Sequence, residues 1–258
     1  DFVYYSFPLP PLPEQEAIAE VLSDTDALIS ALEKRIAKKQ LVKQGAMQTL
    51  LTPQDDWEVK KLPDVCWFQE GPGVRKSQFT LKGVKLLNGT NIEKGKLLLD
   101  KTERYVSEKE AYGWYSHFLV DNGDILIACS GVSIDKFHEK VTIADNNHLP
   151  LCMNTSTMRF KIKTSTLIKS YLIHFLKSKD FKQQISGKAT GSAQLNFGPS
   201  HVSKLLINLP PIEEQTSIAT ILSDMDNEID ALEKKLSKTK ELKQGLMQQL
   251  LTGKIRLA

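Results

Sequence analysis

Two long stretches of the chain carry apolar side chains in alternating steps of four and three residues. In the later stretch the apolar positions are Ile218, Leu222, Met225, Ile229, Leu232 and Leu236. The earlier stretch keeps the same register, with Thr25 in the one polar position and apolar residues at Ile18, Leu22, Ile29, Leu32 and Ile36. Because residues three and four apart share one face of a helix, this spacing predicts two long helices, each with a coiled-coil seam.

The two helical stretches are copies of one another. Residues 9–52 align with residues 209–252 at a constant offset of 200, and 25 of the 44 positions are identical. One copy leads into the intervening segment and the other leads out of it, so pairing within one chain has to be antiparallel. That direction sets the acidic first half of each helix against the lysine-rich second half of the other. We expect a rod about 55 Å long, at 1.5 Å per residue.

The segment between the copies has a different pattern, with short apolar runs broken by Gly, Asn and Asp, as in "GVKLLNGTNI", "GKLLLD", "NGDILIACSG", "KVTIAD" and "TMRFKIK". These runs predict strands, and helical spacing recurs at residues 107–112 and 166–178. We therefore predict an α+β fold in which a globular α/β domain with a mixed sheet accompanies two long antiparallel helices. The expected parts are a first helix region at 9–56, a domain at 57–208 and a second helix region at 209–258.

The first eight residues, "DFVYYSFP", resemble the end of the central domain. In both places a strand-like run leads into Pro-Pro and then into a long helix. We expect residues 1–8 to be the last strand of a preceding domain of the same kind.

Charge separates the central segment from the helices. Residues 57–207 hold 22 Lys and Arg against 14 Asp and Glu, whereas the remaining residues hold 12 against 17. A basic compact domain suits a polyanionic partner such as double-stranded DNA, although a solvated lysine-rich surface has the same composition.

Known catalytic and binding motifs are missing from the sequence. It contains neither GxxxxGK[ST] nor GxGxxG, which predicts no nucleotide or methyl-donor cofactor, and its five histidines lack metal-site spacing, which predicts no metal. A nuclease site built from Asp145, Asp180 and Lys182 is a weak alternative. Three scattered cysteines and the lack of a membrane-length apolar run favour a reduced, cytoplasmic protein without membrane association.

The loops of the central segment are rich in hydrogen-bond donors. Arg and Lys side chains can bind guanine, Asn and Gln can bind adenine, and Ser and Thr can bind phosphate, so such loops suit DNA recognition. The candidate DNA-binding residues are Arg75, Lys76, Asn88, Thr90, Asn91, Ser130, Ser133, Lys136, Lys188, Thr190, Ser192, Gln194 and Asn196.

Three motifs give the chain a family resemblance. These are the duplicated "LPPxxEQ" helix starts, the "KQGxMQxLLT" helix ends and "NGDILIACSG" within the domain. With them the chain resembles the specificity subunits of Type I restriction-modification systems. The resemblance implies target recognition domains that each read half of a bipartite DNA site, and paired helices that dock the methyltransferase subunits and, through them, the restriction subunit. It also implies that catalysis belongs to those partners. This chain departs from the pattern, because it has both helices but only one complete recognition domain.

The sequence thus predicts a non-catalytic DNA specificity subunit that reads one half-site. A coiled-coil oligomerisation adaptor without base-specific DNA binding is the alternative. Two association states stay open: a homodimer with two identical readers, or a monomer whose helices close into a hairpin.

Overall fold

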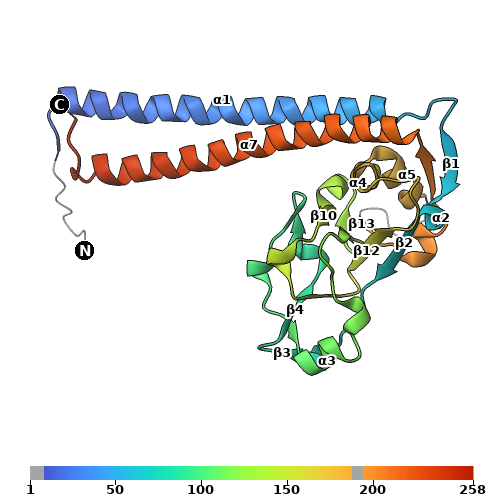
Figure 1. Ribbon diagram of the computed structural model, residues 1–258. Helices are drawn as coiled ribbons and strands as arrows, with labels where there is room; N and C mark the ends of the chain where they lie inside the picture. Colours follow the sequence, from blue (N-terminus) through green and yellow to red (C-terminus); the bar gives the residue numbers. More distant parts are fainter. Residues whose placement is uncertain (1–8, 188–193, 258) are drawn as a thin grey trace. The chain divides into compact units, whose positions relative to one another are not determined.

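The computed structural model describes residues 9–187 and 194–257, in which helices and sheets are combined as the sequence predicts (Figure 1). The chain divides into two compact units. We call Asp1–Ala46 with Leu222–Ala258 the helix unit, and Met47–Ile221 the central unit. No helix in the described part of the chain combines the length and apolar character that a membrane crossing requires.

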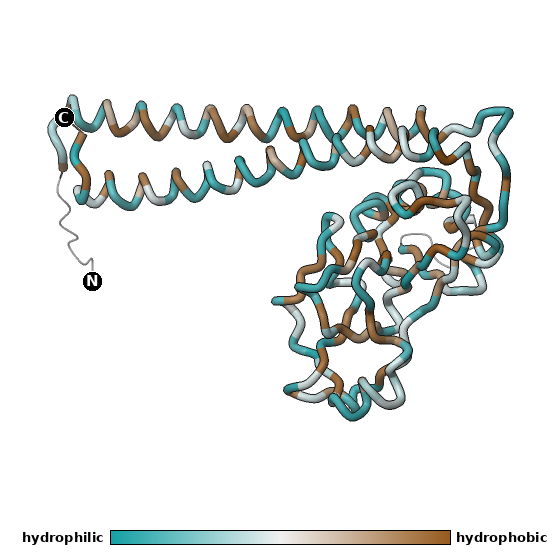
Figure 2. Tube along the Cα trace, in the orientation of Figure 1, coloured by the Kyte–Doolittle hydropathy of each residue, from teal (hydrophilic) through white to brown (hydrophobic). Residues whose placement is uncertain are grey.

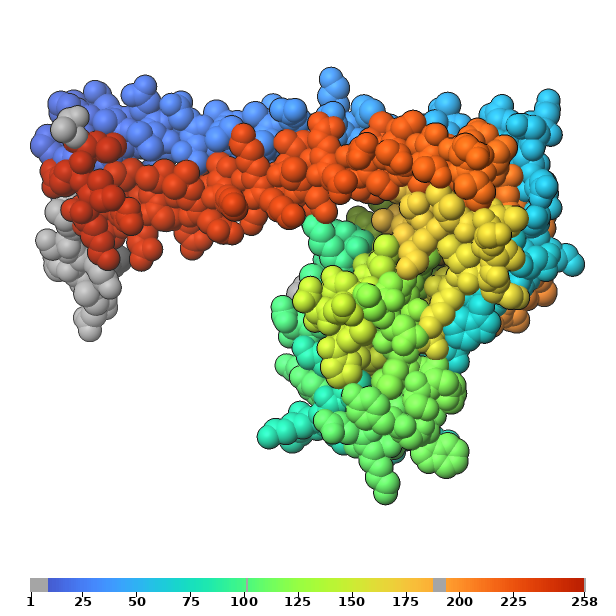
Figure 3. Space-filling view, in the orientation of Figure 1, coloured from blue at the N-terminus to red at the C-terminus, as the bar shows by residue number. Residues whose placement is uncertain are grey.

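The helix unit holds most of α1 (Leu12–Leu50) and of α7 (Ile212–Leu250), two antiparallel helices of 39 residues each. Figure 3 shows their side chains meeting along the pair. Four ion pairs fix the direction, because partner numbers fall along α7 as they rise along α1: Asp26–Lys243, Glu33–Lys240, Lys39–Glu228 and Lys43–Asp226. The first and last of these are the same pair of repeat positions with the copies exchanged, so the repeat gives the pair an approximate internal two-fold symmetry.

The predicted seam residues are all buried or half-buried along the two helices. In Figure 2 apolar positions recur at intervals along each helix, with polar positions between them. Both helices lie inside the regions predicted for them, beginning three residues after the start of each copy. The exact domain boundaries and the assignment of these residues to a coiled-coil seam stay predictions.

Gly45 and Gly245 differ from expectation. A glycine within a helix commonly marks a close approach of another helix, and it costs about 1 kcal/mol relative to alanine. A Cβ atom added at either position would have nothing within 4 Å among the described residues. Side-chain space among the described residues therefore does not explain why both copies carry the glycine.

The central unit is built on two four-stranded sheets. The first has the order β10-β8-β12-β2 and is antiparallel throughout, with β10 at Val141–Ile143, β8 at Ile125–Ala128, β12 at Thr157–Ile162 and β2 at Cys66–Glu70. The second has the order β11-β4-β7-β3 and is mixed, since β11 and β4 are parallel. Its strands are β11 at Leu151–Met153, β4 at Val84–Leu87, β7 at Tyr105–Val106 and β3 at Phe79–Thr80.

The described residues of this unit also form three two-stranded pairs and five shorter α-helices. The pairs are β1 (Glu58–Lys61) with β14 (Leu206–Leu209), β5 (Ile92–Glu93) with β6 (Lys96–Leu97), and β9 (Val132–Ser133) with β13 (Gln194–Leu195). The helices are α2 (Leu62–Val65), α3 (Glu108–Tyr112), α4 (Lys169–Lys177), α5 (Lys179–Ser186) and α6 (Pro199–Val202).

The run "GKLLLD" does not form the continuous strand that its apolar residues predict. Only Lys96–Leu97 is extended, paired with Ile92–Glu93 across a tight turn. Lys94 and Gly95 both have positive φ, 50° and 73°, as a two-residue hairpin turn requires. A 3₁₀ turn at Leu99–Lys101 then ends the run.

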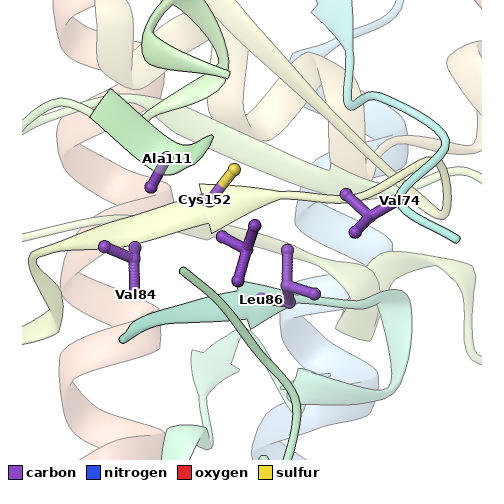
Figure 4. Close-up of a cluster of buried hydrophobic side chains, with 6 residues drawn as sticks. Val74, Val84, Leu86, Ala111 and Cys152 are labelled. Atoms are coloured by element: carbon purple, nitrogen blue, oxygen red, sulfur yellow. The ribbon is translucent and has the colours of Figure 1, made fainter. Parts of the chain in front are cut away.

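The mixed sheet encloses its own apolar cluster (Figure 4). Val84 and Leu86 of β4, Cys152 of β11 and Ala111 of α3 are buried there, together with Val74 from the loop after β2. All three cysteines are buried and free. Burial raises the pKa of Cys66 and Cys129 to about 12 and that of Cys152 to about 11, so these thiols stay protonated at neutral pH.

Candidate nucleic-acid interface

The strand order brings several donor-rich loops to one edge of the central unit. Strands β2 and β8 both run antiparallel to β12, so both end where β12 begins, at Thr157. Parallel strands β4 and β11 also end together, since Leu87 pairs with Met153. We call the loops that follow these strand ends the loop face, and we include the segment that begins with β13, which pairs with β9. The loop face comprises residues 70–76, 88–91, 129–133, 154–156 and 194–198.

Hydrogen bonds join the loops through Ser156 and Thr157. The backbone N–H of Cys129 donates to the Ser156 carbonyl at 2.9 Å, and the N–H of Gly89 donates to the Ser156 hydroxyl at 2.9 Å. The N–H of Gly71 donates to the Thr157 carbonyl at 3.0 Å. Three loops that are far apart in sequence are thereby fixed to one short segment.

Asn196 connects the last segment to the loop after β8. Its Oδ1 accepts from the Ser130 hydroxyl at 3.0 Å and from the Gly131 N–H at 2.8 Å. The Phe197 N–H donates to the Cys129 carbonyl at 2.9 Å, and Gln194 pairs with Ser133 in the short β9–β13 ladder. These contacts hold Ser130, Ser133 and Gln194 as neighbours on the surface.

The loop that carries Arg75 and Lys76 is anchored at both ends. At Gly71 a Cβ atom would lie 2.4 Å from the Asn154 carbonyl oxygen, so this close approach requires glycine. Val74 is buried, while Arg75 and Lys76 are exposed. The following Gln78 donates to the Glu110 carboxylate at 3.0 Å and the Tyr115 hydroxyl at 2.9 Å. The exposed side chains of Arg75 and Lys76 therefore project from a loop whose backbone is held at both ends.

The structure separates the predicted contact residues into three groups. Exposed on or beside the loop face are Arg75, Lys76, Thr90, Ser130, Ser133, Lys136, Gln194 and Asn196. Asn88 is half-buried, with its Oδ1 accepting from Asn154 at 3.0 Å, whereas Asn91 is buried and its side chain bonds the Asn88 N–H and the Leu98 carbonyl. In this structure Asn91 holds the loop and is not presented to solvent. Lys188, Thr190 and Ser192 lie outside the described residues.

Sequence analysis overlooked one charged residue of this surface. Glu70 ends β2 and is half-buried, and its Oε2 lies 3.1 Å from the position that a Cβ of Gly198 would take. Burial raises the pKa of Glu70 above its ordinary value. The sequence could have indicated Glu70 by its position, because it directly precedes the Gly-Pro-Gly of the loop that carries Arg75 and Lys76.

The residues of the weak nuclease alternative serve local structure. Asp145 accepts from the Asn147 N–H at 2.8 Å, and its own N–H donates to His148 Nδ1 at 3.1 Å. Asp180, in α5, accepts from Gln184 at 3.1 Å. No cluster of three His, Cys, Asp or Glu side chains suited to a metal occurs among the residues that the structure describes.

Comparison with known proteins gives a consistent set of matches. A family model described as "Type I restriction modification DNA specificity domain" matches residues 54–244. The chain is 31% identical to the Type I restriction enzyme MjaVIII specificity subunit of Methanocaldococcus jannaschii, covering 99% of this chain and 63% of that protein. It is 27% identical to the putative MjaX specificity subunit of the same organism, covering 98% of this chain and 60% of that protein.

Solved structures share the fold at lower identity. The HsdS subunit from Thermoanaerobacter tengcongensis superposes with a TM-score of 0.57 at 18% identity, covering 96% of this chain and 61% of that one. The S subunit of a Type I restriction-modification system from M. genitalium gives 0.60 at 15% identity, covering 93% and 61%. The chain thus spans less than two thirds of the length of these relatives.

Proposed function

Because this chain belongs to the family of Type I restriction modification DNA specificity domains, we propose that it is a non-catalytic specificity subunit whose central unit reads one half of a bipartite DNA target. We further propose that the paired helices dock methyltransferase subunits, which carry the chemistry and connect to the restriction subunit. The observation that carries the DNA-reading proposal is the convergence of donor-rich loops at one edge of a basic domain.

The loop face combines the two kinds of group that sequence reading needs. Arg75, Lys76 and Lys136 supply positive charge for phosphates, and Ser130 and Gln194 supply short polar groups for phosphates and base edges. The fixed backbone beneath them means that little conformational entropy is lost on binding.

The two repeat copies support a second recognition domain on α1. Gln215 is fully buried, and its amide donates to the Pro210 carbonyl at 2.9 Å and the Thr166 carbonyl at 2.8 Å within the central unit. Its twin Gln15 makes the first of these bonds, to the Pro10 carbonyl at 2.7 Å, and is only half-buried. Leu9 is 71% exposed where its twin Leu209 is 4% exposed. We therefore propose that a domain like the one at the start of α7 packs against the start of α1.

Such a second domain would supply the other half-site of a bipartite target. A second copy of this chain could provide it, giving two identical readers and a palindromic target. Sedimentation that showed only a 29.0 kDa species at working concentration would contradict the homodimer.

Both helices carry the same strip where the methyltransferase subunits would dock, and its residues are exposed except Gly245, which is half-buried. Lys38, Val42 and Gly45 lie on one face of α1, at steps of four and three, and the twin strip on α7 is Lys238, Leu242 and Gly245. Val42 is 50% and Leu242 59% exposed. Since the two strips are related by the symmetry of the repeat, a partner that fits one fits the other, and two partner subunits can bind alike.

The glycines of these strips provide a test of docking. Because a Cβ added at either glycine would meet no other described atom within 4 Å, Gly45→Ala with Gly245→Ala should stabilise the helices by up to about 1 kcal/mol each. If a partner backbone packs there, the same variant should bind methyltransferase subunits at least about tenfold more weakly in a titration. Ser30→Ala with Asp230→Ala is the control at another pair of twin positions. Unchanged affinity in the glycine variant would remove the glycines from the docking surface.

Selection of bound duplexes from a randomised DNA pool, with and without methyltransferase subunits, tests DNA reading directly. We expect one enriched short motif.

Arg75→Ala with Lys76→Ala should lower the affinity for DNA about tenfold and reduce the salt dependence of binding, because two phosphate-neutralising charges are lost. Lys61→Ala with Lys163→Ala is the matched control, since Lys61 ends β1, directly before α2 and β2, and Lys163 directly follows β12, away from the loop face. Equal affinity for all duplexes would instead favour the oligomerisation adaptor.

A further inference from the structure

The loop face contains a carboxylate that makes no hydrogen bond or ion pair with the described residues. Glu70 lies at the end of β2, opposite Met158 of β12, and its side chain rests against Gly198. Burial raises its pKa, which means that the carboxylate lacks part of the solvation it would have in water. A hydrogen-bond donor on a ligand would supply the interaction that the described residues do not give this carboxylate.

The backbone on both sides of this carboxylate is held in place. Glu70 is held by the β2–β12 ladder. On the other side, the Gly198 N–H donates to His201 Nδ1 at 3.1 Å, and the neighbouring Phe197 N–H donates to the Cys129 carbonyl. A Cβ at residue 198 would crowd the Glu70 carboxylate at 3.1 Å, so glycine leaves the space that it occupies.

A negative charge is unfavourable on a surface that binds DNA only through phosphates, because it repels them. It becomes favourable where it faces a hydrogen-bond donor of the DNA. In the major groove such donors are the exocyclic amines of cytosine and adenine.

The chemistry of the bases selects cytosine between these two. An ionised carboxylate can only accept hydrogen bonds. Cytosine presents its N4 amine alone, whereas adenine presents its N6 amine beside the N7 acceptor, which repels a carboxylate oxygen. Guanine and thymine present acceptors at these positions. An amide side chain, with a donor and an acceptor, matches adenine instead.

We propose that Glu70 is a specificity-determining residue that reads the N4 amine of one cytosine in the major groove. The proposal rests on the proposed function, since it requires the loop face to meet DNA bases. Nearby Ser130, Asn196 and Arg75 then contact the flanking phosphates and bases.

The test is duplex selection with the whole chain and with Glu70→Gln, followed by competition binding. The parent should enrich a motif that contains an essential cytosine. At that position Glu70→Gln should prefer adenine, with a change in discrimination of roughly 5- to 150-fold, the range of one good base contact. Glu70→Ala should lose the cytosine preference without gaining adenine, which separates loss of the carboxylate from the new contact that the Gln amide makes.

Asp64→Asn is the matched control. It removes one negative charge at exposed Asp64 of α2, directly before β2, at the end of that strand opposite Glu70. It should leave the preferred bases unchanged.

Two results would overturn the inference, and they are distinguishable. If Glu70→Gln binds every duplex more tightly and keeps the parental motif, Glu70 is a repulsive surface charge and only this inference fails. If the parent enriches no motif, the DNA-reading function fails, and the inference fails with it.

Discussion

Replacing Gln215 by leucine is expected to lower the free energy of unfolding of the central unit by about 3 kcal/mol. The Gln215 amide is fully buried and accepts from the Ile168 N–H at 3.0 Å while donating to the Thr166 and Pro210 carbonyls. Leucine has a similar size but leaves these three backbone groups without their partner, and each buried unsatisfied group costs about 1–3 kcal/mol. Urea unfolding followed by tryptophan fluorescence measures the effect, because all three tryptophans, Trp57, Trp67 and Trp114, lie in the central unit.

The repeat supplies a matched control for this variant. Gln15→Leu makes the same chemical change at the twin position, where only the bond to the Pro10 carbonyl is lost and the side chain is half-buried. Its effect on the fluorescence transition should stay below about 1 kcal/mol. Equal destabilisation by the two variants would show that Gln215 does not attach the start of α7 to the segment before α4.

Arg159→Met should destabilise the central unit by about 3–5 kcal/mol. Arg159 is 5% exposed, and its guanidinium donates to Gln69 Oε1 at 2.8 Å, to the Leu119 carbonyl at 2.6 Å and to Asp124 at 3.2 Å. Methionine fills most of the space but leaves the buried Asp124 carboxylate with the Asp121 N–H, which donates to it at 2.9 Å, and with Lys161 at 3.4 Å. Removing one partner of a buried charge pair costs this much because the other charge stays buried and loses its main compensating charge.

Two further variants decide whether charge or packing causes the loss. Lys161→Met removes a cation that also pairs with Asp124 but is 38% exposed in its side chain, and it should cost about 1 kcal/mol or less. Asp124→Asn combined with Arg159→Met should recover part of the loss, since no buried charge remains. A double variant that is less stable than Arg159→Met alone would assign the effect to packing.

The helices could be predicted from the sequence because their information is local. A step of four and three residues defines one face of a helix, and the offset of 200 between the copies defines twin positions. The antiparallel direction followed from connectivity alone, and the Asp26–Lys243 and Lys43–Asp226 ion pairs agree with it. The strands after Gly83, Asp124 and Ser156 were likewise marked by short apolar runs.

The arrangement of the loop face depended on strand order, which periodicity does not encode. Only the placement of β2 and β8 on either side of β12 brings Gly71 and Cys129 to the same short segment. From the sequence the donors of these loops could be predicted only as a composition. It could not separate exposed Thr90 from buried Asn91, because burial there depends on the Leu98 carbonyl, which accepts from the Asn91 amide.

The sequence by itself therefore determined the two helices, their direction, the basic character of the central domain and the inventory of its loops, because each depends on neighbouring residues or on the course of the chain. The tertiary structure alone decided which loops share a surface and that Glu70 stands among them, resting on Gly198. That contact joins residues 128 positions apart in the chain, and such separations are set by sheet pairing and packing, which no local pattern specifies.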